Sequence, residues 1–217
     1  MLLAFDTATP EVCAAVYDAD TDEVLVELVA ERPMKHGEQL APLIERCLTT
    51  AGLDRRDLTA IAVGVGPGPF TGLRVGLVTA RTLAHVLDLP TYGVCTLDVL
   101  AVEAVESGLV AEPFLVATDA RRKEVYLASY DAAGVRREGP VVTKPAEVAT
   151  ALPVVGPGAT LYPEAFPTAR GPQRPSAAWL ARAVAGERVE LLDPDPLYLR
   201  RPDAVAAAPR VPATPGS

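Results

Sequence analysis

The 217-residue sequence has few cysteines and histidines and no long apolar run. Its three cysteines, Cys13, Cys47 and Cys95, form no CxxC pair, a pattern typical of free, buried thiols in a reducing compartment. With only two histidines, a catalytic thiol has little prospect of a neighbouring base. No segment approaches the roughly 20 apolar residues that span a bilayer, and no basic signal-peptide start is present. We therefore expect a cytoplasmic protein without a membrane segment.

The sequence also lacks a large basic cluster. Its formal net charge is −8, and its cations occur in short groups such as Arg55–Arg56, Arg121–Lys123 and Arg200–Arg201. A protein that binds nucleic acid on its own usually has a basic face, because neutralising phosphates supplies much of the affinity. Autonomous binding to nucleic acid is therefore not expected.

The spacing of apolar residues predicts alternating strands and helices in the first hundred residues. Strands are expected at 2–7, 12–18, 23–30, 61–65 and 91–94, and helices at 36–51, 71–87 and 97–106. The first three strands are too close together for crossover helices, so we expect them to pair antiparallel. An antiparallel meander followed by helices and parallel strands is typical of the ribonuclease H-like half-domain of actin, Hsp70 and sugar kinases.

The second half has the spacing of a smaller, degenerate copy of the first. Strands are expected at 114–118, 124–131, 134–143 and 152–155, and helices at 146–152 and 176–185. We predict an α/β, actin-like ATPase or ribonuclease H-like fold with subdomains at 1–100 and 101–200. The Pro/Ala-rich segment 201–217 is predicted to be a tail without a fold.

The end of the first strand could hold a phosphate. Asp6, Thr7 and Thr9 stand where actin-fold ATPases present polar groups to a nucleotide and its metal. However, Ala8 replaces the glycine that lets the backbone approach a phosphate, and Pro10 lacks an N–H group. We interpret this turn either as a capped strand end or as a vestigial phosphate loop.

The glycine-rich turn before the second helix is the other candidate. A strand-to-helix turn with Gly66, Gly68 and Gly72 can place an anion at a helix N-terminus. Pro67 and Pro69 lack N–H groups and no lysine follows, so the turn is not a Walker A loop. A fixed structural corner is the favoured interpretation, with a vestigial phosphate loop as the alternative.

Several sequence motifs are spread along the chain. They are GPGPFTGLRVG at 66–76 with VCTL at 94–97, LAFDT at 3–7, HGEQL at 36–40, DARRKEVY at 119–126 and PLYLR at 196–200. Together these motifs resemble the TsaB (YeaZ) family of tRNA threonylcarbamoyladenosine biosynthesis proteins. The matches run from residue 3 to residue 200, and GPGPFTGLRVG together with DARRKEVY is the most specific combination. Pro69 and Thr96 stand where the family usually has serine.

The resemblance implies an accessory role. A member of this family would pair with the catalytic paralogue TsaD and support transfer of a threonylcarbamoyl group to adenosine 37 of tRNA. The ATPase TsaE would join that pair, tRNA would be contacted only indirectly, and the chain alone could form a homodimer. TsaD binds a metal through two histidines at i and i+4, whereas here Leu40 follows His36 at that spacing. We therefore expect no catalytic residue, no metal site and no cofactor.

The first two helices are the partner surface that the family implies. The second helix is apolar on two sides, with Val75, Val78 and Val86 opposite its main apolar stripe. One side can cover the chain's own sheet and the other a partner helix, although another part of the same chain could cover it equally well. The predicted interface comprises Leu40, Leu43, Ile44, Cys47, Leu73, Leu77, Ala80, Arg81 and Ala84.

Two enzymatic alternatives stay open at this point. An active actin-fold ATPase or kinase would use Asp6 and the Gly66–Gly72 turn, and micromolar binding of Mg-ATP would reveal it. A peptidase would need a nucleophile with its base or a metal, and the sequence offers no convincing set of either.

Overall fold

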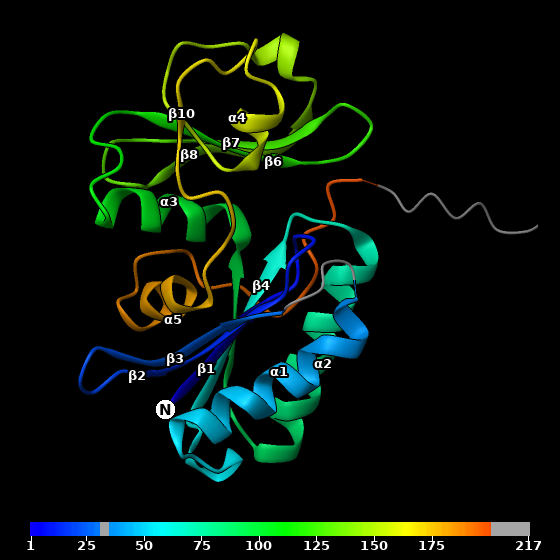
Figure 1. The fold of residues 1–217 in the computed structure, drawn as a ribbon, viewed down its shortest axis with the longest axis vertical. Helices are drawn as coiled ribbons and strands as arrows, with labels where there is room; N and C mark the ends of the chain where they lie inside the picture. Colours follow the sequence, from blue (N-terminus) through cyan, green and yellow to red (C-terminus); the bar gives the residue numbers. More distant parts are fainter. Residues whose placement is uncertain (31–34, 201–217) are drawn as a thin grey trace, which may run out of the picture.

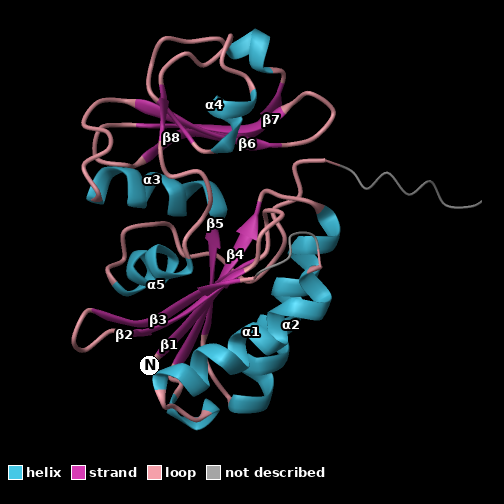
Figure 2. Cartoon of the chain, viewed as in Figure 1, coloured by secondary structure: helices cyan, strands magenta, loops and turns pink. Residues whose placement is uncertain are grey.

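The computed structural model describes residues 1–30 and 35–200, which form two five-stranded sheets with helices packed on them (Figures 1 and 2). The predicted tail at 201–217 lies outside the described residues. The strands are β1 Leu2–Asp6, β2 Cys13–Asp18, β3 Glu23–Val29, β4 Ala60–Gly66, β5 Thr91–Cys95, β6 Phe114–Asp119, β7 Val125–Tyr130, β8 Arg136–Thr143, β9 Val154–Val155 and β10 Ala169–Arg170. The helices are α1 His36–Ala51, α2 Phe70–Leu87, α3 Thr96–Glu106, α4 Pro157–Leu161 and α5 Ala177–Ala185, with short 3₁₀ turns η1 Arg55–Asp57 and η2 Pro145–Val148.

The two sheets have the same strand order. The first runs β3-β2-β1-β4-β5, with the meander β1–β2–β3 antiparallel and β4 and β5 parallel to β1. The second runs β8-β7-β6-β9-β10, again with an antiparallel meander followed by parallel pairing of β9 with β6 and of β10 with β9. The predicted actin-like, ribonuclease H-like fold is therefore confirmed. The second copy is reduced, because β9 and β10 have only two residues each.

Helices cover both faces of the first sheet, which is why β1 is buried along its whole length. Alternate side chains of a strand point to opposite faces. Leu3 and Phe5 accordingly contact the core beneath α1 and α2, whereas Leu2 and Ala4 contact the core beneath α5. Figure 1 shows these two layers on either side of β1.

Helix α3 lies between the two sheets (Figure 1). Leu97, Leu100 and Ala101 pack against β6 and β7, and Val99 belongs to the core beneath α5. Helix α4 covers the opposite face of the second sheet. Because α5 packs on the first sheet, residues 101–200 contribute to the layers of both halves. The division into subdomains at residue 100 stays a prediction.

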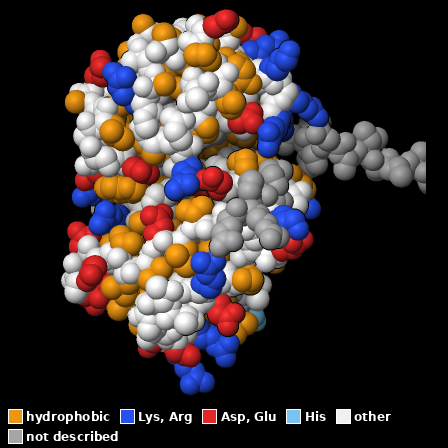
Figure 3. Space-filling view, viewed as in Figure 1, with side chains coloured by type: hydrophobic (Ala, Val, Ile, Leu, Met, Phe, Trp, Pro, Cys, Tyr) orange, Lys and Arg blue, Asp and Glu red, His pale blue; other side chains and the backbone are white. Residues whose placement is uncertain are grey.

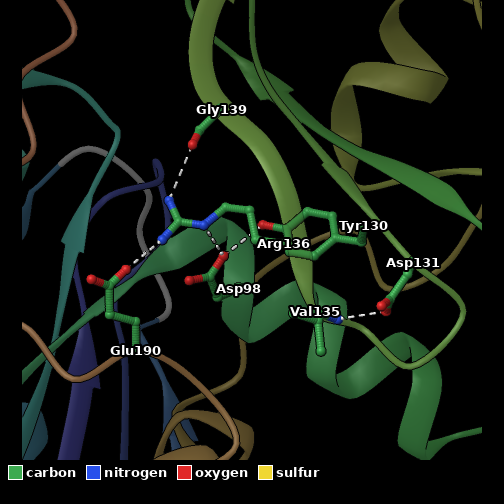
Figure 4. A network of polar contacts seen from close by, with 7 residues as sticks. All are labelled: Asp98, Tyr130, Asp131, Val135, Arg136, Gly139 and Glu190. Atoms are coloured by element: carbon green, nitrogen blue, oxygen red, sulfur yellow. Dashed lines mark hydrogen bonds and ion pairs between the residues drawn. The ribbon is translucent and has the colours of Figure 1, made fainter.

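A buried polar network joins α3 to the second sheet (Figure 4). Tyr130 Oη donates to Asp98 Oδ1 at 2.7 Å, and Arg136 Nε lies 3.3 Å from the same oxygen. Nη2 of Arg136 lies 3.0 Å from Oε2 of Glu190, in the segment that follows α5. Burial raises the pKa of Asp98, and the contacts with Tyr130 and Arg136 lower it. The network thus ties α3, two strands of the second sheet and the segment after α5 together.

The structure corrects the predicted elements of the second half. The helix expected at 146–152 is only the 3₁₀ turn η2, because Ala149 is already extended and Pro153 disfavours helical geometry at residue 152. The strand expected at 152–155 shrinks to β9. The short elements α4 and β10 were not predicted, since two to five residues carry no readable periodicity.

Candidate functional site

The turn after β1 is closed by its own hydrogen bonds. The carboxylate of Asp6 accepts the N–H of Ala8 at 2.6 Å and the hydroxyl of Thr96 at 2.7 Å, and Asp6 is 1% exposed. Burial raises the pKa of Asp6, and these two hydrogen bonds oppose the shift. Both carboxylate oxygens are therefore engaged inside the chain.

The glycine-rich turn packs directly on this first turn. A Cβ atom at Gly68 would lie 2.2 Å from the carbonyl oxygen of Ala8, and one at Gly72 would lie 2.5 Å from that of Thr7. The hydroxyl of Thr7 donates to the carbonyl of Gly72 at 2.9 Å, and a Cβ at Gly76 would lie 2.4 Å from that hydroxyl. The backbone of the glycine-rich turn lies against the backbone of the turn after β1, and a side chain larger than that of glycine at these positions would prevent this close approach.

All six predicted phosphate-loop positions gather at this corner. Thr9 donates its hydroxyl to Glu11, and its carbonyl oxygen lies 2.7 Å from Nε2 of the buried His36. Gly66 has φ +96°, a conformation suited to glycine. These contacts join the two turns to each other and to α1.

The cysteine thiols and the possible metal ligands of the chain are the remaining candidates for catalytic groups. Cys13, Cys47 and Cys95 are free and buried, as predicted, and burial raises the pKa of Cys47 to about 11 and of Cys95 to about 12. Thiols with such pKa values are poor nucleophiles at neutral pH. Within residues 1–30 and 35–200 no group of three His, Cys, Asp or Glu residues is placed to hold a metal, and no helix there could cross a membrane.

The predicted partner interface has to be corrected. Most of its residues lie in the chain's own core, because the most regular apolar stripe of a surface helix is the one that packs on its own sheet. Arg81 is exposed and Ala84 is half-buried. The buried members are Leu40, Leu43, Ile44, Cys47, Leu73, Leu77 and Ala80.

The opposite face of α2 is exposed and partly apolar. Val78 is 62% exposed and Val86 is 70% exposed, one turn on either side of the exposed Thr82. Gly37 of α1 borders this face, since a Cβ there would lie 3.9 Å from Val75. The second helix is thus apolar on two sides, as its sequence suggests, and residues 1–30 and 35–200 cover only one of them.

A cleft of about 910 Å³ separates the two halves. It is lined by the turn after β1, the turn after β6, α3 and the segment leading into α5. Glu103 of α3 lines it, and Oε2 of this residue is buried with no hydrogen-bond partner within the described part of the chain. Burial and, to a lesser degree, the charge of Glu27 raise the pKa of Glu103 to about 7, against the opposing effect of Arg174. Glu103 was not predicted as a site residue, although a single carboxylate in the apolar run 99–105 was a usable signal.

The segment 196–200 contacts both halves of the molecule. The N–H of Leu197 donates to Val65 in β4 at 2.9 Å, and the ring of Tyr198 stacks on Phe70 with centroids 4.7 Å apart. Arg200 then donates to the carbonyl of Ala120 at 2.8 Å and pairs with Glu124. The PLYLR motif therefore joins the start of α2 to the turn after β6.

Comparisons with known proteins agree on one family. A family model described as "TsaD: tRNA N6-adenosine threonylcarbamoyltransferase" matches residues 28–169. An uncharacterized protein of Mycobacterium tuberculosis is 44% identical over 207 residues, which covers 94% of this chain and 93% of that protein. The Escherichia coli tRNA threonylcarbamoyladenosine biosynthesis protein TsaB is 40% identical over 129 residues, covering 59% of this chain and 54% of that protein. The solved structure of YeaZ from Pseudomonas aeruginosa superposes with a TM-score of 0.74 at 30% identity, covering 91% of this chain and 99% of that one.

Proposed function

Because this chain belongs to the TsaB (YeaZ) family, we propose that it serves threonylcarbamoyladenosine synthesis on tRNA as a partner subunit that pairs with TsaD. It would contribute no catalytic residue, and the exposed faces of α1 and α2 would form the contact. TsaE would join the assembled pair, and in the absence of TsaD the same faces would form a homodimer.

The observation that carries this proposal is the apolar face of α2 that the described part of the chain leaves exposed. Val78 and Val86 expose most of their side chains beside Thr82, on a helix whose other side is already filled by the core. An amphipathic partner helix would bury these side chains, and apolar patches of this kind mark protein contacts. The flanking charge of Arg81 can contribute to a polar rim.

The ATPase or kinase alternative has weaker support. It needs Asp6 and the Gly66–Gly72 turn to face a nucleotide, whereas both oxygens of Asp6 are bonded to Ala8 and Thr96 and the glycines pack on the turn after β1. A titration with Mg-ATP tests it directly. Micromolar affinity of the isolated chain would revive this alternative.

The experiment that tests pairing uses an exposed position of α2. Ala80 belongs to the interface predicted from the sequence but is fully buried, so Ala80→Glu would unfold the chain rather than report on pairing. Val78→Glu together with Val86→Glu adds the charges where the side chains are exposed. We expect this double variant to stay folded and to lose co-purification with its own TsaD.

The matched control is Val141→Glu, which changes an exposed valine (49%) on the edge strand β8. This variant should pair normally. Undiminished pairing of the double α2 variant, or failure of the unaltered chain to pair with TsaD, would contradict the proposed function.

A further inference from the structure

The turn between β6 and β7 carries three consecutive basic residues in an uncommon backbone conformation. Arg121, Arg122 and Lys123 have φ of 60°, 56° and 62°. This left-handed region costs a residue with a side chain roughly 1 kcal/mol or more. Asp119 stabilises the turn, since its Oδ1 accepts the N–H of Arg121 at 2.7 Å and its Oδ2 lies 3.2 Å from Nη1 of Arg121. The turn thus holds a run of cations at the surface at a local energetic cost.

Two further arginines border the same turn. Arg200 contacts it through Ala120 and Glu124. Arg74 of α2 places its guanidinium 3.8 Å above the ring of Phe70 and donates from Nε to the hydroxyl of Tyr198 at 3.2 Å. These two arginines and the three cations of the turn therefore lie near the start of α2, in a chain whose net charge is −8, and Asp119 and Glu124 pair with Arg121 and Arg200. Lys and Arg side chains also gather along the right-hand edge of the upper half in Figure 3.

Aromatic rings lie among these cations. Phe70 and Tyr198 are stacked at 4.7 Å with an interplanar angle of 23°, and Tyr198 is 37% exposed. Tyr126 lies beside them, with its hydroxyl 3.5 Å from the carbonyl oxygen of Gly68. A hollow of about 240 Å³ separates the start of α2 from the basic turn, and its lining comprises residues 68–70, 119–122, 126 and 198–200.

We propose that this surface binds an unpaired segment of RNA. We call it the basic rim and define it as Arg74, Arg121, Arg122, Lys123 and Arg200 with the rings of Phe70 and Tyr198. The cations would neutralise backbone phosphates, and the exposed ring of Tyr198 would stack on one unpaired base. An acidic peptide would satisfy the cations but would leave the stacked rings unused, so the combination favours RNA.

This inference rests on the proposed function, because the RNA concerned is the tRNA substrate of the assembled pair. It differs from the sequence-based expectation that tRNA is contacted only indirectly. The overall negative charge explains why the isolated chain should bind weakly, since the rest of the surface repels phosphates. Within the pair, the basic rim would add a few phosphate contacts to those of the partner.

The test measures binding of a fluorescently labelled RNA stem-loop to the assembled pair as a function of salt. Arg122→Glu with Lys123→Glu should weaken binding at least tenfold near 100 mM salt and lower the salt slope by about one for each phosphate that is no longer neutralised.

The matched control is Arg55→Glu with Arg56→Glu. It makes the same charge change at η1, which precedes β4, whereas the basic rim lies beyond the other end of that strand. The control should keep the affinity of the unaltered pair to within about threefold.

The stacking contribution is tested separately. Tyr198→Ala should weaken binding roughly tenfold, whereas Tyr198→Phe keeps the ring and should retain most of the affinity. If the charge reversal unfolds the chain, Arg122→Asn with Lys123→Asn removes the charges with a residue that tolerates positive φ, and the affinity should fall in the same direction.

Equal RNA affinity of the rim variants and the unaltered pair would overturn the inference, and so would an equal loss in the η1 control. Loss of TsaD pairing with unchanged RNA affinity would identify the basic rim as a protein contact and would also overturn it. If the unaltered chain fails to pair with TsaD, the proposed function fails instead. The same variants are then compared on the chain alone at low salt, where the expected order of affinities is the same.

Discussion

The turns after β1 and β6 occupy the same place in two sheets of the same strand order, and yet they have opposite properties. Each strand ends in an aspartate. Asp6 is 1% exposed and bonded to Ala8 and Thr96, whereas the side chain of Asp119 is 27% exposed and pairs with Arg121. The glycine-rich turn and α2 pack on the first turn, whereas the second turn carries exposed cationic side chains. Both turns line the cleft between the halves. Topology therefore places a polar turn at a given position, but the segments packed on it decide whether it becomes a structural corner or an accessible surface.

The largest expected difference between the two turns is in the stability lost when each aspartate is replaced by alanine. Asp6→Ala leaves the N–H of Ala8 and the hydroxyl of Thr96 without their buried acceptor, so we expect a loss of about 3 kcal/mol in the free energy of unfolding. Asp119→Ala removes a partly exposed ion pair and one turn hydrogen bond and should cost about 1 kcal/mol or less. Urea denaturation of both variants measures the difference. Equal losses would show that the first turn is not the more tightly integrated of the two.

A pair of helical glycines tests whether close packing holds the first turn. Gly76→Ala places a Cβ 2.4 Å from the hydroxyl of Thr7 and should destabilise the chain by about 2 kcal/mol, although alanine favours helices. Gly37→Ala in α1 meets only ordinary contacts at 3.9 Å and should be neutral or stabilise by up to about 1 kcal/mol. Thermal unfolding of the two variants gives the comparison. A stable Gly76→Ala variant would mean that α2 can move away from the turn.

The cleft between the two turns contains Glu103, whose pKa is raised to about 7. Between the ordinary pKa of a glutamate and about 7, the folded chain binds more protons than the unfolded chain. The stability contributed at this residue therefore falls as pH rises from about 4.5 to about 7. Glu103→Gln should remove this fall and stabilise the protein at pH 8 by about 1 kcal/mol, with little effect at pH 5. Urea denaturation at the two pH values checks it, and an equal effect at both would show that Glu103 does not titrate in this way.

The smallest expected effect concerns the backbone of the second turn. Arg122→Asn replaces a side chain held at φ 56° with one that tolerates this region, so stability should rise by about 0.5 kcal/mol. Thermal unfolding measures this gain in stability. A decrease would show that contacts of Arg122 stabilise the turn by more than its backbone conformation costs.

Much of the first half could be predicted, because long elements leave a clear pattern. The helix at 36–51 is observed at the expected positions, with Gly52 in the left-handed conformation at its end. In the second half the predicted helix at 146–152 is wrong, since a six- or seven-residue pattern broken by nearby prolines cannot be distinguished from a turn. The position of the glycine-rich corner was also predictable, because alternating glycine and proline restrict the backbone wherever they occur.

The sequence by itself determined the order of strands and helices along the first half, the family and the two apolar sides of α2. Only the tertiary structure decided which side is which: Leu73 and Leu77 face the core, and Val78 and Val86 face solvent. Helical periodicity records that a face is apolar but not what covers it, because that depends on the sheet to which distant segments contribute. The same holds for the basic rim, whose members Arg74, Arg121 and Arg200 are brought together only when the segment 196–200 returns to the start of α2.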